Sequence, residues 1–254
     1  MFVPLEYIKY RWNAKGRHGI HSPFVFNFVD NCVRIKLKAE DTRTLNNLFR
    51  RLKNSRQEIE IQDFGSGSKK LGSKRKVSAI FNMSSSKGKY GELLYRLSKH
   101  YQPKEILEFG TSLGVGSTYF ALGSPKSNIT TVEACQNTRS VALENLKDFN
   151  SVESKLGTFV DYLAELPTNK KFDLIFIDGH HDGEALIRYL DQLQDHAHDE
   201  TIFVLDDIRW SDSMKSAWVE IAEDSRFHLS MELFRVGIVS RRSGMEKEKF
   251  VVRY

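Results

Sequence analysis

The stretch Ile106–Phe120 reads ILEFGTSLGVGSTYF and decides the fold class. Its apolar start, residues 106–109, predicts a short buried strand, and the three glycines that follow predict a tight turn. A helix is expected to begin near Ser117. Strand, glycine-rich turn and helix in this order are typical of an α/β fold whose parallel sheet binds ligands at its strand ends.

The same alternation of short apolar runs with amphipathic stretches continues beyond this turn. Helical spacing is expected near 90–101, 117–122, 138–149, 183–196 and 213–223. Two last strands, Phe227–Leu233 and Val236–Ser240, have no helix between them, which predicts an antiparallel end of the sheet. We therefore expect a Rossmann-like, mostly parallel seven-stranded sheet with helices on both faces over residues 87–254. The other five predicted strands are Ile106–Phe109, Ile129–Val132, Leu156–Val160, Phe172–Ile177 and Ile202–Leu205.

The front of the chain has a different charge from the rest. Of 38 basic and 33 acidic residues, 22 basic and 8 acidic lie in residues 1–104, so the remainder is acidic. Residues 1–86 are predicted to be a basic, mainly helical N-terminal appendage. Ser22 and Pro23 favour a helix start there, a second helix is expected over 42–53, and GSGSKKLGSKRK at 65–76 is typical of an exposed loop.

Composition excludes several classes of protein. A hydrophobic share of 40% is enough for a folded core, so a disordered chain is excluded. No apolar run reaches the ~18 residues of a membrane span, and the first residues lack the apolar centre of a signal peptide. Two cysteines provide neither a disulfide framework nor a zinc cluster. We expect a cytoplasmic protein without a membrane partner.

The glycine-rich turn is the candidate binding site. Glycine lets a ligand approach the backbone, and the start of the following helix offers unpaired N–H donors. Glu133, at the end of the next strand, is placed to accept both ribose hydroxyl protons of an adenosine. A second glycine segment, residues 63–68, is followed by lysines and is interpreted as a loop. The candidate cofactor-binding residues here are Glu108, Gly110, Thr111, Ser112, Gly114, Gly116, Ser117 and Glu133.

Three aspartates follow two neighbouring strands of the predicted sheet. Asp178 comes after the strand 172–177, and Asp206 with Asp207 comes after the strand 202–205. Converging carboxylates repel one another unless a cation or donors lie between them, and such oxygen ligands suit Mg²⁺ or Ca²⁺. Asp178, Asp206 and Asp207 are therefore candidate metal ligands. The alternative is that Asp206 and Asp207 cap the following helix or turn.

These motifs together resemble the class I S-adenosylmethionine-dependent methyltransferases. Glu108-x-Gly110 with Glu133 matches their first two motifs, and FDLIFIDGHH (172–181) and LDDIRWSD (205–212) match two later strand ends. The resemblance covers about residues 87–240 and is closest to catechol-type and sugar-modifying O-methyltransferases. The resemblance implies that S-adenosylmethionine is the cofactor and that Asp178 and His180 also belong to the cofactor-binding site. It also implies a divalent metal at Asp178, Asp206 and Asp207. The segment HGIHSPFVF (18–26) also resembles an N-terminal extension of related enzymes.

Methylation of an oxygen requires that the hydroxyl proton leaves as the bond forms. In the catechol-type relatives a lysine three positions after the aspartate is the base, and His181 has that spacing here. Histidine is suited to this role near neutral pH. His181 and Asp178 are therefore the candidate catalytic residues, with His180 as the alternative base.

Two other functions are consistent with parts of the sequence. An NAD(P)-dependent oxidoreductase of Rossmann type would share the glycine spacing, but the Tyr-x3-Lys pair of short-chain dehydrogenases is absent downstream of the turn. A non-catalytic module that binds S-adenosylmethionine or RNA is the second alternative, since the front of the chain is basic. A small-molecule substrate is favoured over nucleic acid. The basic region is consistent with an anionic substrate. The sequence is also consistent with a homodimer.

Overall fold

The computed structural model describes residues 2–16, 22–62, 73–84, 86–179, 181–242 and 246–254. By its internal contacts the chain divides into two compact units. Unit 1 comprises Met1–Val29 and Glu165–Tyr254, and unit 2 comprises Asp30–Ala164. This division differs from the one predicted at residue 86, because the first helix groups with the C-terminal half.

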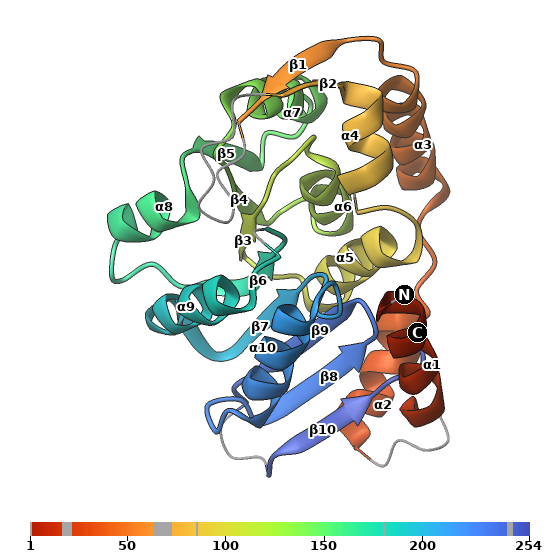
Figure 1. The fold of residues 1–254 in the computed structure, drawn as a ribbon, viewed down its shortest axis with the longest axis vertical. Helices are drawn as coiled ribbons and strands as arrows, with labels where there is room; N and C mark the ends of the chain where they lie inside the picture. Colours follow the sequence, from red (N-terminus) through yellow and green to blue (C-terminus); the bar gives the residue numbers. More distant parts are fainter. Residues whose placement is uncertain (1, 17–21, 63–72, 85, 180, 243–245) are drawn as a thin grey trace. The chain divides into compact units, whose positions relative to one another are not determined.

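Unit 2 contains the glycine-rich turn and the three strands around it. β3 (Glu105–Phe109), β4 (Asn128–Glu133) and β5 (Val152–Leu156) pair in parallel. The turn follows β3 and leads into α6, as the sequence predicts (Figure 1). The helices of this part are α5 (Gly88–Tyr101), α6 (Val115–Gly123), α7 (Gln136–Leu146) and α8 (Phe159–Glu165).

The strand predicted at 156–160 is placed too late in the sequence. The strand ends at Leu156, and a helix, α8, begins at Phe159. Gly157 has a φ of +154°, and Thr158 and Asp161 then exchange hydrogen bonds, Thr158 Oγ1 donating to Asp161 Oδ2 at 2.6 Å and accepting from its N–H at 3.1 Å. This reciprocal bonding stabilises a helix start, so the apolar residues beyond Gly157 continue as a helix.

Residues 30–84 supply further helices and a short ribbon. The predicted helix at 42–53 is present as α3 (Ala39–Lys53), and α4 (Val77–Ser84) follows the ribbon. Residues 73–76 of the predicted loop form strand β2 (Ser73–Lys76), antiparallel to β1 (Glu58–Ile61); the rest of that loop lies outside the described residues. Glu58 faces Lys76 and Glu60 faces Lys74, and opposite charges facing each other stabilise such a pair.

Unit 1 contains the remaining strands of the sheet. β6 (Phe172–Ile177) runs parallel to β7 (Ala197–Leu205), and the predicted hairpin β8 (Leu229–Leu233) and β9 (Val236–Ser240) lies antiparallel to β7. One strand more than predicted, β10 (Glu248–Val251), pairs in parallel with β8. The strands follow the order β10-β8-β9-β7-β6 in unit 1 and β3-β4-β5 in unit 2, so the mostly parallel sheet has eight strands where seven were predicted.

Helices cover the strands of unit 1. α9 (Gly183–Leu193), extended by the short η3 (Gln194–His196), packs beside α10 (Asp212–Glu223) (Figure 1). The ring of Trp218 on α10 lies so close to Gly237 of β9 that a Cβ there would overlap it. This close approach explains why glycine occupies the strand at that position. Among the described residues, no helix is both long and apolar enough to cross a bilayer.

The first residues of the chain belong to unit 1 through buried polar contacts. Helix α1 (Phe2–Asn13) buries the Glu6 carboxylate, which pairs with Lys215 of α10 at 2.9 Å and with Arg209. A short helix, α2 (Pro23–Asn27), starts at Pro23 as predicted. The Ser22 hydroxyl makes no capping bond, however, because it donates to the Glu248 carboxylate of β10 at 2.6 Å. The π-helical η2 (Phe28–Val33) follows.

Candidate functional site

The turn after β3 has the backbone conformation that glycine permits. Gly110 and Gly114 have φ values of +102° and +79°, which are strained for residues with a Cβ. The N–H groups of Gly110 and Thr111 both donate to Val132 O of β4, at 3.1 and 3.2 Å. The turn is therefore held against the neighbouring strand, and helix α6 begins immediately after it at Val115.

Two of the turn glycines also lie where a side chain would not fit. A Cβ on Gly116 would overlap Glu108 Oε1, and a Cβ on Gly114 would lie 3.0 Å from the Leu146 side chain of α7. The helix start thus packs directly on β3 and α7. Close packing at the first turn is a known reason for glycine in nucleotide-binding turns.

Glu108 is fully buried beneath the turn. Ser117 of α6 donates to its Oε2, while Oε1 has no hydrogen-bond partner among the residues that the structure describes. Burial raises the pKa of this carboxyl to about 7, and the hydrogen bond from Ser117 opposes the shift. Glu108 therefore braces the helix start and leaves one acceptor atom unfilled.

Glu133 connects the turn to the end of β4. Its Oε2 accepts the Ser112 N–H at 2.9 Å, and its Oε1 accepts the Cys135 N–H at 2.9 Å. Burial raises its pKa, and these backbone hydrogen bonds oppose that rise. The Thr111 and Thr131 hydroxyls share a hydrogen bond of 2.6 Å below it. The structure thus brings all the turn residues predicted for the cofactor into one cluster within unit 2.

A support from outside the turn was missed by the sequence analysis. Asn145 of α7 is buried, and its amide donates to Leu113 O in the centre of the turn at 2.9 Å. Arg51 of α3 in turn donates to Asn145 Oδ1 at 2.7 Å. Nothing in the local sequence signals this contact, because the partners lie 32 and 94 residues apart.

In unit 1 the paired aspartates have a partner that the sequence analysis did not anticipate. The Arg235 guanidinium, in the turn between β8 and β9, donates from Nε to Asp206 Oδ1 at 3.0 Å and from Nη2 to Asp206 Oδ2 at 2.7 Å. Its Nε also lies 2.8 Å from Asp207 Oδ1. The alternative that these aspartates cap the following helix does not hold, since Ser211 caps α10.

The aspartate cluster does not fit the predicted metal site. A divalent ion such as Mg²⁺ needs free carboxylate oxygens, and the guanidinium already takes both oxygens of Asp206 and one of Asp207. Asp178 follows β6 and raises the Arg235 pKa by its negative charge, so it lies in the same electrostatic environment. The described residues also contain no group of three or more metal-binding side chains.

His181 lies beside this cluster. Its Nδ1 is 3.6 Å from Asp207 Oδ2, and its ring centroid is 5.4 Å from that of Trp210. His181 and Asp207 both have positive φ values, 39° and 52°, which non-glycine residues adopt rarely. Burial and the nearby Asp206 raise the pKa of Asp207 to about 7. His180, the other candidate base, lies outside the described residues.

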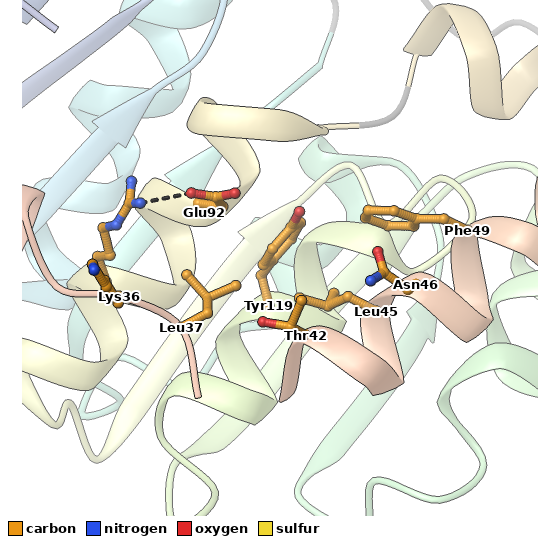
Figure 2. A pocket seen from close by; sticks show the side chains of 9 residues that line it. Lys36, Leu37, Thr42, Leu45, Asn46, Phe49, Glu92 and Tyr119 are labelled. Carbon is orange, nitrogen blue, oxygen red and sulfur yellow. Dashed lines mark hydrogen bonds and ion pairs between the residues drawn. The ribbon is translucent and has the colours of Figure 1, made fainter. Parts of the chain in front are cut away.

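A cavity of about 250 Å³ lies elsewhere in unit 2, among α3, α5 and α6. Figure 2 shows Tyr119 and Phe49 lining it, with Glu92 paired to the unlabelled arginine, Arg96, at 2.6 Å. Ligand pockets usually measure about 300–1,000 Å³, and the charges of this pair compensate each other. None of the predicted site residues lines this cavity, so no function is assigned to it.

Comparison with known proteins agrees with this fold. Residues 107–208 match a family model described as "Methyltransferase domain". The fold resembles the O-methyltransferase from Bacillus cereus in complex with SAH, at 19% identity and a TM-score of 0.57, over 85% of this chain and 97% of that one. A SAH-bound methyltransferase from Podospora anserina matches at 18% identity and a TM-score of 0.57, over 82% of this chain and 97% of that one.

A third similar structure is an O-methyltransferase of tomaymycin synthesis from Streptomyces achromogenes, in complex with SAM. It has 19% identity and a TM-score of 0.54, over 63% of this chain and 82% of that one. The mostly parallel α/β fold with its glycine-rich turn is the fold of these methyltransferase structures. The chain therefore carries a methyltransferase domain over residues 107–208.

Proposed function

We propose that the protein methylates a hydroxyl oxygen of a small molecule with S-adenosylmethionine. One observation carries the proposal most directly. The β3–α6 turn combines glycines with positive φ values, the N–H donors of a helix start and the carboxylate of Glu133 at the end of the next strand. These are the groups that an adenosine-containing cofactor with a carboxylate requires.

The residues of unit 2 fit this cofactor in type and charge. Glu133 is suited to the ribose hydroxyls, because a carboxylate accepts two hydrogen bonds. The N–H groups at the start of α6 suit the cofactor's carboxylate. The unfilled Oε1 acceptor of Glu108 is suited to a donor group, directly or through a water molecule. Thr111, Ser112 and Ser117 contribute the backbone and hydroxyl contacts that shape the turn.

Bound S-adenosylmethionine supplies a methyl group on a positively charged sulfur. The methyl carbon would pass to the substrate oxygen, and the electron pair of the C–S bond would stay on sulfur. The hydroxyl proton passes to the His181 imidazole, the candidate general base. Asp178 is expected to orient the substrate, because it follows β6 at the strand end that matches the motif of the catechol-type enzymes.

Two finer points are part of this proposal. The acceptor is expected to be anionic, because the first 104 residues carry 22 basic and 8 acidic side chains. A homodimer and a cytoplasmic location remain predictions from the sequence.

The test is transfer of a labelled methyl group from S-adenosylmethionine to a panel of catechols, phenols, hydroxy acids and sugars. We expect at least one hydroxyl compound to be methylated, and His181→Ala to lower kcat by about 10²-fold or more. His198→Ala is the matched control, since His198 pairs with Asp173 away from the aspartate cluster and should leave kcat unchanged. Methylation of an amine panel only would contradict oxygen as the acceptor atom.

A further inference from the structure

Arg235 contacts the aspartate segment through both its side chain and its backbone. Its guanidinium bonds Asp206 through two parallel contacts and Asp207 through a third. Its backbone carbonyl accepts the Ile208 N–H at 3.0 Å, one residue beyond Asp207. Paired N–H donors matched to one carboxylate give the strongest and most directional form of such a contact.

Burial makes this contact hard to replace by water. The Asp206 side chain is 2% exposed and that of Asp207 is 14% exposed, while Arg235 is 32% exposed. A divalent ion that took these oxygens would have to expel Arg235 and give up its directional hydrogen bonds to both carboxylates.

We propose that Arg235 takes the place of a divalent metal at the aspartate cluster, so that this methyltransferase works without one. The role of Arg235 in catalysis rests on the proposed function, whereas the pairing of Arg235 with the two aspartates does not depend on it. Arg235 supplies the positive charge that keeps Asp206 and Asp207 together. Because it leaves Asp207 Oδ2 free to face His181 Nδ1 at 3.6 Å, Asp207 becomes a positioning residue for the imidazole.

The orientation of His181 follows from this arrangement. His181 Nδ1 lies at ion-pair distance from Asp207 Oδ2, 3.6 Å, so the carboxylate would stabilise the imidazolium that forms when His181 takes up the substrate proton. The same guanidinium that replaces the metal therefore also fixes the carboxylate behind the base. In a metal-bound site, by contrast, Asp207 would be used as a ligand.

The experiment measures Mn²⁺ binding to the full chain by the loss of the free Mn²⁺ electron paramagnetic resonance signal. We expect wild type to bind no Mn²⁺ tightly, and Arg235→Met to bind it about tenfold more tightly or better, because Asp206 and Asp207 then lose the cation that pairs with them. Arg241→Met is the matched control, since Arg241 bonds Gln194 instead of the cluster, and it should behave as wild type.

Wild-type binding of Mn²⁺ that is lost in Asp206→Asn would overturn the inference. If Arg235→Met does not fold, Mn²⁺ binding by wild type and by Asp206→Asn tests the inference without it. Arg235→Lys keeps the positive charge and should bind Mn²⁺ no more tightly than wild type. Titration of the same samples with S-adenosylmethionine separates the two proposals. Wild type that binds neither ligand refutes the proposed function and supports the assignment of the cation site to Arg235.

Discussion

Replacing Gly116 by alanine tests how tightly the cofactor turn is built. The added Cβ would overlap Glu108 Oε1 and lie 3.4 Å from Glu108 Cδ, in a place where Glu108 is fully buried and has little room to move. Overpacking of a filled core costs about 1–3 kcal/mol, and the directness of this overlap places the cost at the upper end, about 2–3 kcal/mol. For a chain of this size that lowers the Tm by about 5–10 °C.

The assay is urea denaturation followed by circular dichroism, with S-adenosylmethionine affinity measured by calorimetry. Gly16→Ala is the matched control, because a Cβ at Gly16 would meet no atom within 4 Å, and it should leave stability unchanged. In a Glu108→Ala background the Gly116→Ala penalty should shrink to less than about 1 kcal/mol, since the overlapping atom is gone. Gly116→Ala as stable as wild type would refute the packing described for the turn.

Three further predictions concern buried polar groups. The pKa of Glu108 is about 7 in the folded protein and 4.5 in the unfolded chain, so the folded state binds the proton more tightly. The stability that this proton contributes is therefore lost as the pH rises from about 4.5 to 7. Glu108→Gln should remove that loss, which denaturation curves at the two pH values would measure. Asn145→Ala should cost about 1–3 kcal/mol and weaken S-adenosylmethionine binding in calorimetry, because Leu113 O loses its donor. Glu6→Gln should lower the unfolding free energy by about 1–3 kcal/mol, whereas the exposed Lys9→Gln should cost less than about 1 kcal/mol.

The fold was predictable where the sequence pattern is local. A strand ending at Phe109, glycines and a helix start are adjacent in the chain, so their structure follows from short-range preferences. The hairpin β8–β9 was predicted for the same reason. β10 and α1 were missed, because a short strand at the end of the chain and a helix with exposed Leu5 and Ile8 carry no clear periodic signal.

The site was predictable for the turn and only partly for the aspartates. Asp206 and Asp207 are consecutive residues at the end of β7, but the partner that compensates them comes from 28 residues or more further along the chain. The antiparallel pairing of β9 with β7 places Gly237 opposite Leu205 and so brings the residues just before Gly237 near Asp206. The sequence predicted the antiparallel strand but not its register.

Calorimetric titration of the protein with S-adenosylmethionine, with NAD as the competing ligand, tests the central claim most directly. We predict that S-adenosylmethionine binds at one site per chain and NAD does not, with affinity reduced about tenfold or more in Glu133→Gln. Glu153→Gln, an exposed change on β5, should leave that affinity unchanged. Binding of NAD in place of S-adenosylmethionine, or equal affinity in wild type and Glu133→Gln, would contradict the assignment of the turn to this cofactor.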